Sequence, residues 1–369
     1  MNTLVPLEYY TPIFYNFLLI VIFFVFLKSN IVEIQDSNNL KAKNNLGVFL
    51  LIFVIFYMGL RPVSGMYFGD MRTYSNTFQL YSVGGTIAGD KDVYFEYFMK
   101  WCSRIMSEGM FFLICAFLYT YPLYLFSKKV FKEYWFYSFL IIVISFSFWG
   151  YGVNGIRNGI ATSLFLLGIS REKKPGMILF LLLSVLVHKS SLILVVVYLI
   201  TAKYKNSKWL LFFWFLAIPL SLTLGGFWEQ FFLNFGFGEE DRIKGYLADE
   251  ENEFQEQFRS IGFRWDFLLY SFTGVFTGWY FIFKKKFEDV FYSHIYNFYL
   301  ITNAFWILVI RASFSNRFAY LSWFILGILI VYPFLKNQFF YRQHAILGKI
   351  IVAYFLISYM FNIVLFKQN

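Results

Sequence analysis

The stretch YSFLIIVISFSFWGYGVNGIRNGIATSLFLLGI, residues 137–169, contains a single charged side chain, Arg157. An apolar run of about 20 residues is long enough to cross the roughly 30 Å hydrocarbon core of a bilayer as a helix. A guanidinium near hydrocarbon is costly without a partner, yet no acidic residue lies within four positions of Arg157. We therefore expect the partner of Arg157 to come from elsewhere.

Similar apolar runs recur along all 369 residues, of which 59% are hydrophobic, 24% aromatic and only 15% charged. This composition lies outside the soluble range. It predicts an all-α polytopic integral membrane protein, with a single transmembrane domain over residues 1–369 and about twelve spans. The predicted spans centre on residues 11–27, 45–60, 110–126, 134–150, 154–170, 176–188, 190–202, 208–224, 265–283, 294–310, 318–335 and 346–366. An alternative for residues 176–202 is one kinked or re-entrant unit.

Positive residues in short loops indicate the cytoplasmic side, and here alternate loops carry clusters rich in lysine. Assigning these loops to the cytoplasm places both termini outside. It leaves two long external loops, at about 61–109 and 225–264. The basic clusters are Lys28, Lys41 and Lys43; residues 128–132, 171–174, 203–208 and 284–286; and Lys336, Arg342 and Lys349.

Arginine and lysine are distributed differently under this topology. Nine of the 11 arginines fall on the external side, but only five of the 21 lysines do. The positive-inside preference applies to both residue types, so it leaves the external arginines unexplained. Because a guanidinium offers planar paired donors to phosphate and keeps its charge, the external face is predicted to bind an anionic partner.

The first long loop contains LRPVSGMYFGDMRTYSNTF, in which Arg61 and Arg72 stand on either side of Asp70. Its two glycines allow tight turns that bring backbone close to a ligand. We interpret Asp70 as an acid/base or hydroxyl-orienting group in a phosphate-binding mouth. The alternative is an exposed loop in which Asp70 pairs with a neighbouring arginine.

Glycines at 152, 155 and 159 surround Arg157 and form a small-residue face that lets helices pack closely. They leave Arg157 little shielding and suggest a helix that begins inside a cavity. The alternative is that Arg157 extends to the membrane interface, as arginines near helix ends do.

His188 and Lys189 interrupt the apolar run LLLSVLVHKSSLILVVVYLI, residues 181–200. A short turn between two helices would explain the two serines that follow, as caps of the second helix. It explains the histidine less well. In a chain with three histidines, His188 at the outer mouth is interpreted as a phosphate donor or proton carrier.

Arg311 and Arg317 bracket a further connection, in IRASFSNRFAYLSWF. They are interpreted as functional, although anchoring of helix ends, a task shared with Trp and Tyr, is the alternative. Residues 225–265 hold nine acidic and four basic side chains together with several aromatics. A charge run is usually a solvated face, but the aromatics favour an amphipathic lid that also lies on the membrane surface.

Four of these stretches resemble the EpsG-type branch of the Wzy-like polysaccharide polymerases, integral membrane proteins of bacterial capsule, exopolysaccharide and O-antigen assembly. The matching pieces are GMYFGDMRTYSNTF, GIRNGIATSLFLLGI, HKSSLILVVVYLI and RASFSNRFAYL. Their order and one-sided placement also match, over roughly residues 45–335. The chain has Asn158 where family members often have glutamine, and its aspartate loop lacks the commoner Gly-Thr-Asp sequence.

The resemblance implies a GT-C-like architecture and an enzyme that transfers a growing glycan from undecaprenyl pyrophosphate onto the non-reducing end of a lipid-linked repeat unit. It implies a bacterial inner-membrane protein whose site faces the periplasm or exterior, and it implies that the anionic partner of Arg157 lies in the substrate. Its expected partners are undecaprenyl-pyrophosphate-linked oligosaccharides, the bilayer and a chain-length regulator protein. The expected catalytic residues are Asp70, Arg157 and His188, and the expected substrate-binding residues are Arg61, Arg72, Tyr74, Asn158, Lys189, Arg311 and Arg317.

Two other functions fit the same residues. An O-antigen ligase, or another lipid-linked glycosyltransferase, uses the same donor with a different acceptor. A flippase of lipid-linked oligosaccharide also needs cations for pyrophosphate, but it should place them along a path through both halves of the bilayer, often with inverted repeats. The sequence contains no P-loop, dinucleotide fingerprint or zinc-type spacing, so no cofactor, metal or nucleic acid is expected.

Overall fold

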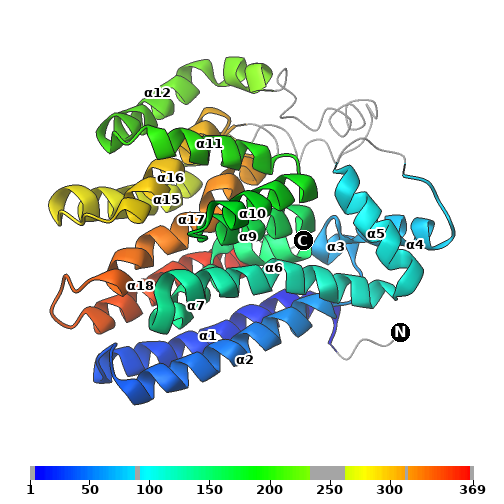
Figure 1. Ribbon diagram of the computed structural model, residues 1–369, viewed down its shortest axis with the longest axis horizontal. Coiled ribbons are helices and arrows are strands. Elements are labelled where there is room, and N and C mark those ends of the chain that lie inside the picture. Colours follow the sequence, from blue (N-terminus) through cyan, green and yellow to red (C-terminus); the bar gives the residue numbers. More distant parts are fainter. Residues whose placement is uncertain (1–4, 88–91, 233–261, 312–314, 366–369) are drawn as a thin grey trace. The chain divides into compact units, whose positions relative to one another are not determined.

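The computed structural model of the chain describes residues 5–87, 92–232, 262–311 and 315–365. Over these residues every regular element is a helix (Figure 1). The chain forms two compact units. Unit 1 comprises residues 1–192 and 331–369, and unit 2 comprises residues 193–330. The predicted all-α class is confirmed, whereas most of the predicted lid, residues 233–261, lies outside the described residues.

Unit 1 is a bundle in which α2 packs on α6, α6 on α9, α9 on α10, and α1 on α18. Its elements are α1 (Leu7–Ile31), α2 (Ser37–Gly59), α3 (Gly65–Phe68), α4 (Met71–Ser82), α5 (Val93–Ile105), α6 (Glu108–Phe131), η1 (Lys132–Tyr134), α7 (Trp135–Val143), α8 (Phe146–Val153), α9 (Ile156–Ile169), α10 (Lys174–Val187), α18 (Gln343–Tyr359) and η4 (Met360–Leu365).

Unit 2 is built around α16, against which α12 and α15 pack. Its elements are α11 (Ser191–Lys203), α12 (Ser207–Phe232), α15 (Trp265–Trp279), η3 (Tyr280–Lys284), α16 (Val290–Leu308) and α17 (Ser315–Lys336). The first residues of α11 and the last residues of α17 belong to unit 1.

Every predicted span overlaps one or more of the described helices, but within the described residues only six helices are long and apolar enough to cross a membrane. These are Leu7–Ile31, Ser37–Gly59, Glu108–Val143, Ser207–Trp228, Phe318–Lys336 and Gln343–Val364. The apolar helices α9, α10 and α11 have 14, 14 and 13 residues, which at 1.5 Å per residue gives about 20 Å, short of the hydrocarbon core. The number of crossings and the GT-C-like architecture stay predictions.

The stretch that carries Arg157 lies in the interior of unit 1. Helices α7 and α8 are almost entirely buried, as expected for helices that are apolar on every face. Breaks after Val143 and Val153 divide the apolar run into short helices, and irregular backbone at membrane depth is tolerated where protein surrounds it. The predicted close packing is confirmed, because a Cβ on Gly152 would overlap Met58 and one on Gly159 would press on Tyr119.

Four of the predicted cytoplasmic loops lie together at one end of unit 1, which we call the lysine end. Lys129 pairs with Glu172 at 2.8 Å, Lys336 donates to the carbonyl of Val130, and His344 contacts the carbonyl of Val32 at 2.6 Å. These contacts join the turns at 32–36, 128–134, 171–174 and 336–344.

The predicted external loop at 61–109 is at the opposite end of unit 1, where its described parts fold into α3, α4 and α5 (Figure 1). Ser64 caps α3 by accepting from the amide of Tyr67 at 3.2 Å, and Ser107 caps α6. We call this the Asp92 end, and it comprises residues 61–74, 92–96, 154–158 and 188–189. The opposite placement of lysine-rich turns and arginine-bearing loops agrees with the alternation predicted from charge.

Candidate active site

Asp92 is the residue around which the site is built. It precedes α5 with a left-handed backbone, at φ 50°, a region that non-glycine residues enter uncommonly and Asp more readily than most. An aspartate at this position usually caps its own helix, but Asp92 makes no side-chain cap hydrogen bond. Its carboxylate is 5% exposed and contacts two other segments of the chain.

Three groups converge on the Asp92 carboxylate. Arg157 Nη1, from the start of α9, lies 3.0 Å from Oδ2. His188 Nδ1, from the end of α10, lies 2.7 Å from the same oxygen, and the Lys189 amide donates to Oδ1 at 2.9 Å. The carboxylate thus fixes the start of one helix against the end of another.

Arg157 is held from a second direction by aromatic and acidic groups. Its Nε donates to the hydroxyl of Tyr74 at 3.1 Å, and the guanidinium lies over the Tyr74 ring at 5.6 Å. Glu96, one turn after Asp92 on α5, lies 3.9 Å from Nη1 and accepts from Tyr81 at 2.7 Å. The side chain is 22% exposed, and Nη2 makes no hydrogen bond or ion pair among the described residues.

The electrostatics keep Asp92 charged. Burial by itself raises the pKa of a carboxyl, but the hydrogen bond and charge of His188, followed by Arg157 and the Lys189 amide, hold the pKa of Asp92 below its ordinary value. Burial and then the hydrogen bond to Glu96 raise the pKa of Tyr81. Asp92 is therefore an acceptor at neutral pH, and Tyr81 a donor.

Asp70 begins α4 and is attached to the segment that carries Arg157. Its backbone amide donates to Asn154 Oδ1 at 2.8 Å. Gly69 has φ +53°, and a Cβ there would lie 2.5 Å from the same oxygen. Only glycine fits this turn. The backbone at Gly69 therefore approaches closely, as predicted, and what it contacts is Asn154, which holds the loop in place.

Arg61 differs from Arg157 in its surroundings. It is 4% exposed, and it donates to the carbonyls of Met58 and Val153, the latter at 2.9 Å. Its guanidinium lies over the rings of Phe68 and Phe112. Arg61 thus joins α2 to the break before α9, and its nitrogens do not face an open surface.

The other predicted residues are divided between the two units. Arg72 on α4 and Lys189 are exposed, and Asn158 is half-buried on α9, next to Arg157. Arg311 follows α16 in unit 2, and its buried Nε has no hydrogen-bond partner among the described residues. Arg317 is in α17, also in unit 2, and its side chain lies outside the described residues.

Asp92, Glu96 and Asn154 were missed by sequence reasoning. Asp92 and Glu96 stand four residues apart in KDVYFEYF, a spacing that places them on one helix face and that could have marked them as a pair. Nothing near Arg157 in the sequence points to them, because Asp92 precedes it by 65 positions. The resemblance implied that the anionic partner of Arg157 lies in the substrate. In the structure the guanidinium is already paired with Asp92, a carboxylate of the protein itself.

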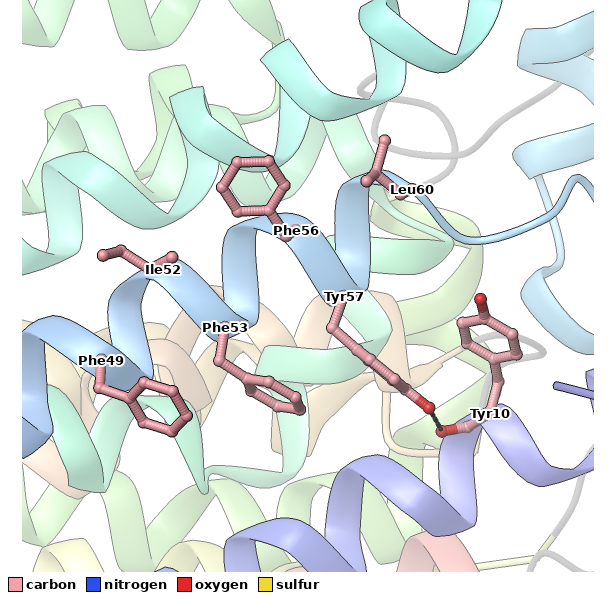
Figure 2. Close-up of a pocket in the computed structure, with 7 residues that line it drawn as sticks. All are labelled: Tyr10, Phe49, Ile52, Phe53, Phe56, Tyr57 and Leu60. Carbon is pink, nitrogen blue, oxygen red and sulfur yellow. Dashed lines mark hydrogen bonds between the residues drawn. The ribbon is translucent and has the colours of Figure 1, made fainter. Parts of the chain in front are cut away.

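An apolar groove on α1 and α2 is separate in character from this polar site (Figure 2). Within it the Tyr57 hydroxyl donates to the Tyr10 carbonyl at 3.0 Å. No charged side chain lines it. Its lining residues are Tyr10, Phe49, Ile52, Phe53, Phe56, Tyr57 and Leu60.

Comparison with known proteins identifies the family. No curated protein and no solved structure matches this chain. The model of the EpsG family matches residues 44–369, which include all the described residues of the Asp92 end. The match covers most of the sequence and confirms the resemblance drawn from the four motif stretches. The chain belongs to the EpsG family.

Proposed function

We propose that this protein is a polysaccharide polymerase that transfers a growing glycan from undecaprenyl pyrophosphate to the non-reducing end of a lipid-linked repeat unit. Family membership supports a polymerase of this general kind, and the six long apolar helices support a membrane setting. We place it in the bacterial inner membrane, with the Asp92 end outside. Lipid-linked oligosaccharides and a chain-length regulator protein are its proposed partners.

The observation that carries this proposal is the immobilised guanidinium of Arg157. Two of its nitrogens are held by Asp92 and Tyr74. The third, Nη2, has no partner among the described residues and can bind a ligand. Transfer from a lipid pyrophosphate develops negative charge on the leaving oxygen. A donor held in place beforehand stabilises that charge without reorganising during the reaction.

The carboxylates of Asp92 and Glu96 offset the charge of Arg157, so its contribution is a directed hydrogen bond more than net attraction. The net electrostatic attraction for the diphosphate is therefore proposed to come from Lys189 and Arg72, which are both exposed. Arg311 and Arg317 are proposed to bind the same class of substrate from unit 2.

The acceptor hydroxyl loses a proton as it attacks the anomeric carbon, so the site needs a base or an orienting acceptor. Asp70, at the start of α4, is proposed to orient this hydroxyl. Asn158 and Tyr74 are proposed to contact the glycan beside it: the half-buried Asn158 follows Arg157 on α9, and the buried Tyr74 accepts a hydrogen bond from Arg157 Nε.

The purified protein in liposomes tests the proposal directly. Given only externally oriented undecaprenyl-pyrophosphate repeat units, it should elongate them without nucleotide sugar or ATP, since the bond to pyrophosphate supplies the driving force. Movement of the same substrate across the bilayer without elongation would show that the protein is a flippase and not a polymerase. Transfer of finished chains only to a different, non-polymeric acceptor would show that the protein is a ligase.

The proposed orientation is tested with single cysteines at exposed positions of the two ends. Val83→Cys and Thr86→Cys, beside α4, should react with a membrane-impermeant thiol reagent in intact cells. Gln35→Cys and Gln338→Cys, at the lysine end, should resist it until the membrane is opened. Background labelling should be low because Cys102 and Cys115 are buried, and the reverse pattern would overturn the orientation.

A further inference from the structure

The three histidines of the chain have different hydrogen-bond partners. His344 is 2% exposed and both of its ring nitrogens are occupied, by the Val32 carbonyl and the Tyr137 hydroxyl at 2.6 Å each. His294 Nε2 contacts the Tyr198 carbonyl and the Thr201 hydroxyl, at 3.0 and 3.1 Å. Neither has a carboxylate partner among the described residues.

His188 alone combines a carboxylate on one nitrogen with an open second nitrogen. Nδ1 lies 2.7 Å from Asp92 Oδ2, and Nε2 has no partner within the described part of the chain. The side chain is 18% exposed, so a ligand can approach it. An ionised carboxylate only accepts hydrogen bonds, which requires the proton of a neutral His188 to be on Nδ1 and the lone pair on Nε2.

We infer that Asp92 is a positioning residue that holds His188 as the general base of the transfer. The inference rests on the proposed function and names the base that the function requires. As the acceptor hydroxyl oxygen bonds to the anomeric carbon, its proton passes to His188 Nε2. The bond from that carbon to the phosphate oxygen breaks, and the electron pair leaves with the lipid pyrophosphate.

Asp92 performs two tasks in this arrangement. It fixes the ring orientation and tautomer of His188, and it stabilises the imidazolium that forms when the proton is taken up. The same oxygen contacts Arg157, which places the proton acceptor beside the donor to the leaving group. Glu96 on α5 also faces this cluster, and Lys189, the residue after His188, contacts it through its backbone amide.

A double-mutant cycle measured on lipid-linked repeat units tests the inference. Asp92→Asn preserves volume and an oxygen for the Lys189 amide, but its amide group donates to Nδ1 and moves the ring proton to Nε2, where it blocks the base. We expect kcat to fall about 10²-fold to 10⁴-fold, as on loss of a general base, with KM nearly unchanged. His188→Gln should fall by a similar factor.

The informative variant combines the two changes. If Asp92 acts through His188, the loss of kcat on adding Asp92→Asn to His188→Gln should be clearly smaller than the loss that Asp92→Asn causes alone, and what remains is the part that acts through Arg157. An equal further loss in the double variant would overturn the inference and assign Asp92 to Arg157 alone. Asp36→Asn is the matched control: Asp36 caps α2 at the lysine end, where asparagine caps equally well, and kcat should not change.

Two further results keep the test decisive. If Asp92→Asn accumulates poorly, Asp92→Glu replaces it. The charge beside Arg157 is kept while the carboxylate moves, so kcat should fall less than with asparagine, and the loss should again be smaller in the His188→Gln background than in the unmodified protein. If the unmodified protein fails to elongate the substrate, the proposed function fails. Elongation by a His188→Gln variant at the normal rate would overturn the general base alone.

Discussion

Near the lysine end of unit 1, as at its Asp92 end, a basic side chain and a histidine occur together, but these groups have different partners. Lys43, 5% exposed, lies over the rings of Phe136 and Tyr137, and His344 uses both ring nitrogens. At the other end Arg157 and His188 share the carboxylate of Asp92. Arg157 Nη2 and His188 Nε2 have no partner among the described residues.

The difference teaches that residue type alone does not mark a site. Histidine and a basic residue occur at both ends, and composition cannot separate them. At the lysine end backbone carbonyls, a hydroxyl and aromatic rings satisfy the polar groups, which rigidifies the fold. At the Asp92 end a carboxylate holds two donors in place and leaves further hydrogen-bonding positions, which is the arrangement that chemistry requires.

Among changes that leave Asp92 and His188 in place, the largest effect is expected where Arg157 meets its ligand. Arg157→Lys keeps the charge but removes the planar fork, so Asp92, Tyr74 and a phosphate oxygen cannot all be bound at once. We expect the rate of elongation to fall about 10²-fold to 10³-fold, as on loss of one preorganised donor, at normal protein levels. Lys129→Arg at the lysine end is the control and should elongate normally. A normal rate in Arg157→Lys would support the interfacial alternative for this residue.

A smaller loss is expected where the first loop is attached to residue 154. Gly69→Ala introduces a Cβ against Asn154 Oδ1 and should displace Asp70, lowering kcat by up to about 10²-fold. Gly84→Ala is the matched control, because Gly84 also has positive φ, +92°, but nothing lies within 4 Å of its Cβ position. Equal losses of kcat in both variants would mean that backbone strain causes the effect. They would give no support to a role for Asp70 in the reaction.

Arg61 should affect stability more than activity. Arg61→Met keeps most of the apolar stem but leaves the carbonyls of Met58 and Val153 unpaired, at about 1–3 kcal/mol for each buried group. We expect a lower Tm in detergent, with the turnover of the folded fraction within about threefold of normal. A normal Tm together with a much weaker apparent affinity for the lipid-linked substrate would return Arg61 to the substrate-binding residues predicted from sequence.

The smallest effect belongs to the exposed pair at the lysine end. Lys129→Ala removes an ion pair to Glu172 that lies at the surface, where such pairs contribute little because solvent screens them. Neither the Tm nor the elongation rate should change measurably. A clear loss of activity would show that the lysine end takes part in the reaction, against the comparison drawn above.

The helices could be predicted from sequence because apolar runs of this length leave few other structures in lipid. The alternation of lysine-rich and arginine-bearing loops also agrees with their grouping at the two ends of unit 1. The break after Val153 falls at the predicted boundary between the spans at 134–150 and 154–170. The break after Val143 was not predicted, since the residues around it are as apolar as the helices. It follows helix α7, which packs on α2 and α6, and this packing is a tertiary property.

The candidate site could be predicted only in part. The motif stretches named Arg157, His188 and Tyr74, which the structure brings together. Asp92 was missed because its role depends on contacts with residues 65 and 96 positions away. Arg61 could not be told from Arg157 by sequence, because both are arginines beside apolar helices and differ only in what surrounds the guanidinium.

The size distribution of glycans made by cells that carry Arg157→Ala tests the central claim most directly. With repeat units built and flipped as usual, single units should persist on the outer face while long chains vanish, because only elongation is blocked. Cells carrying Lys129→Ala should make chains of normal length. Long chains at normal abundance in the Arg157→Ala cells, or single units trapped on the cytoplasmic face, would contradict the account.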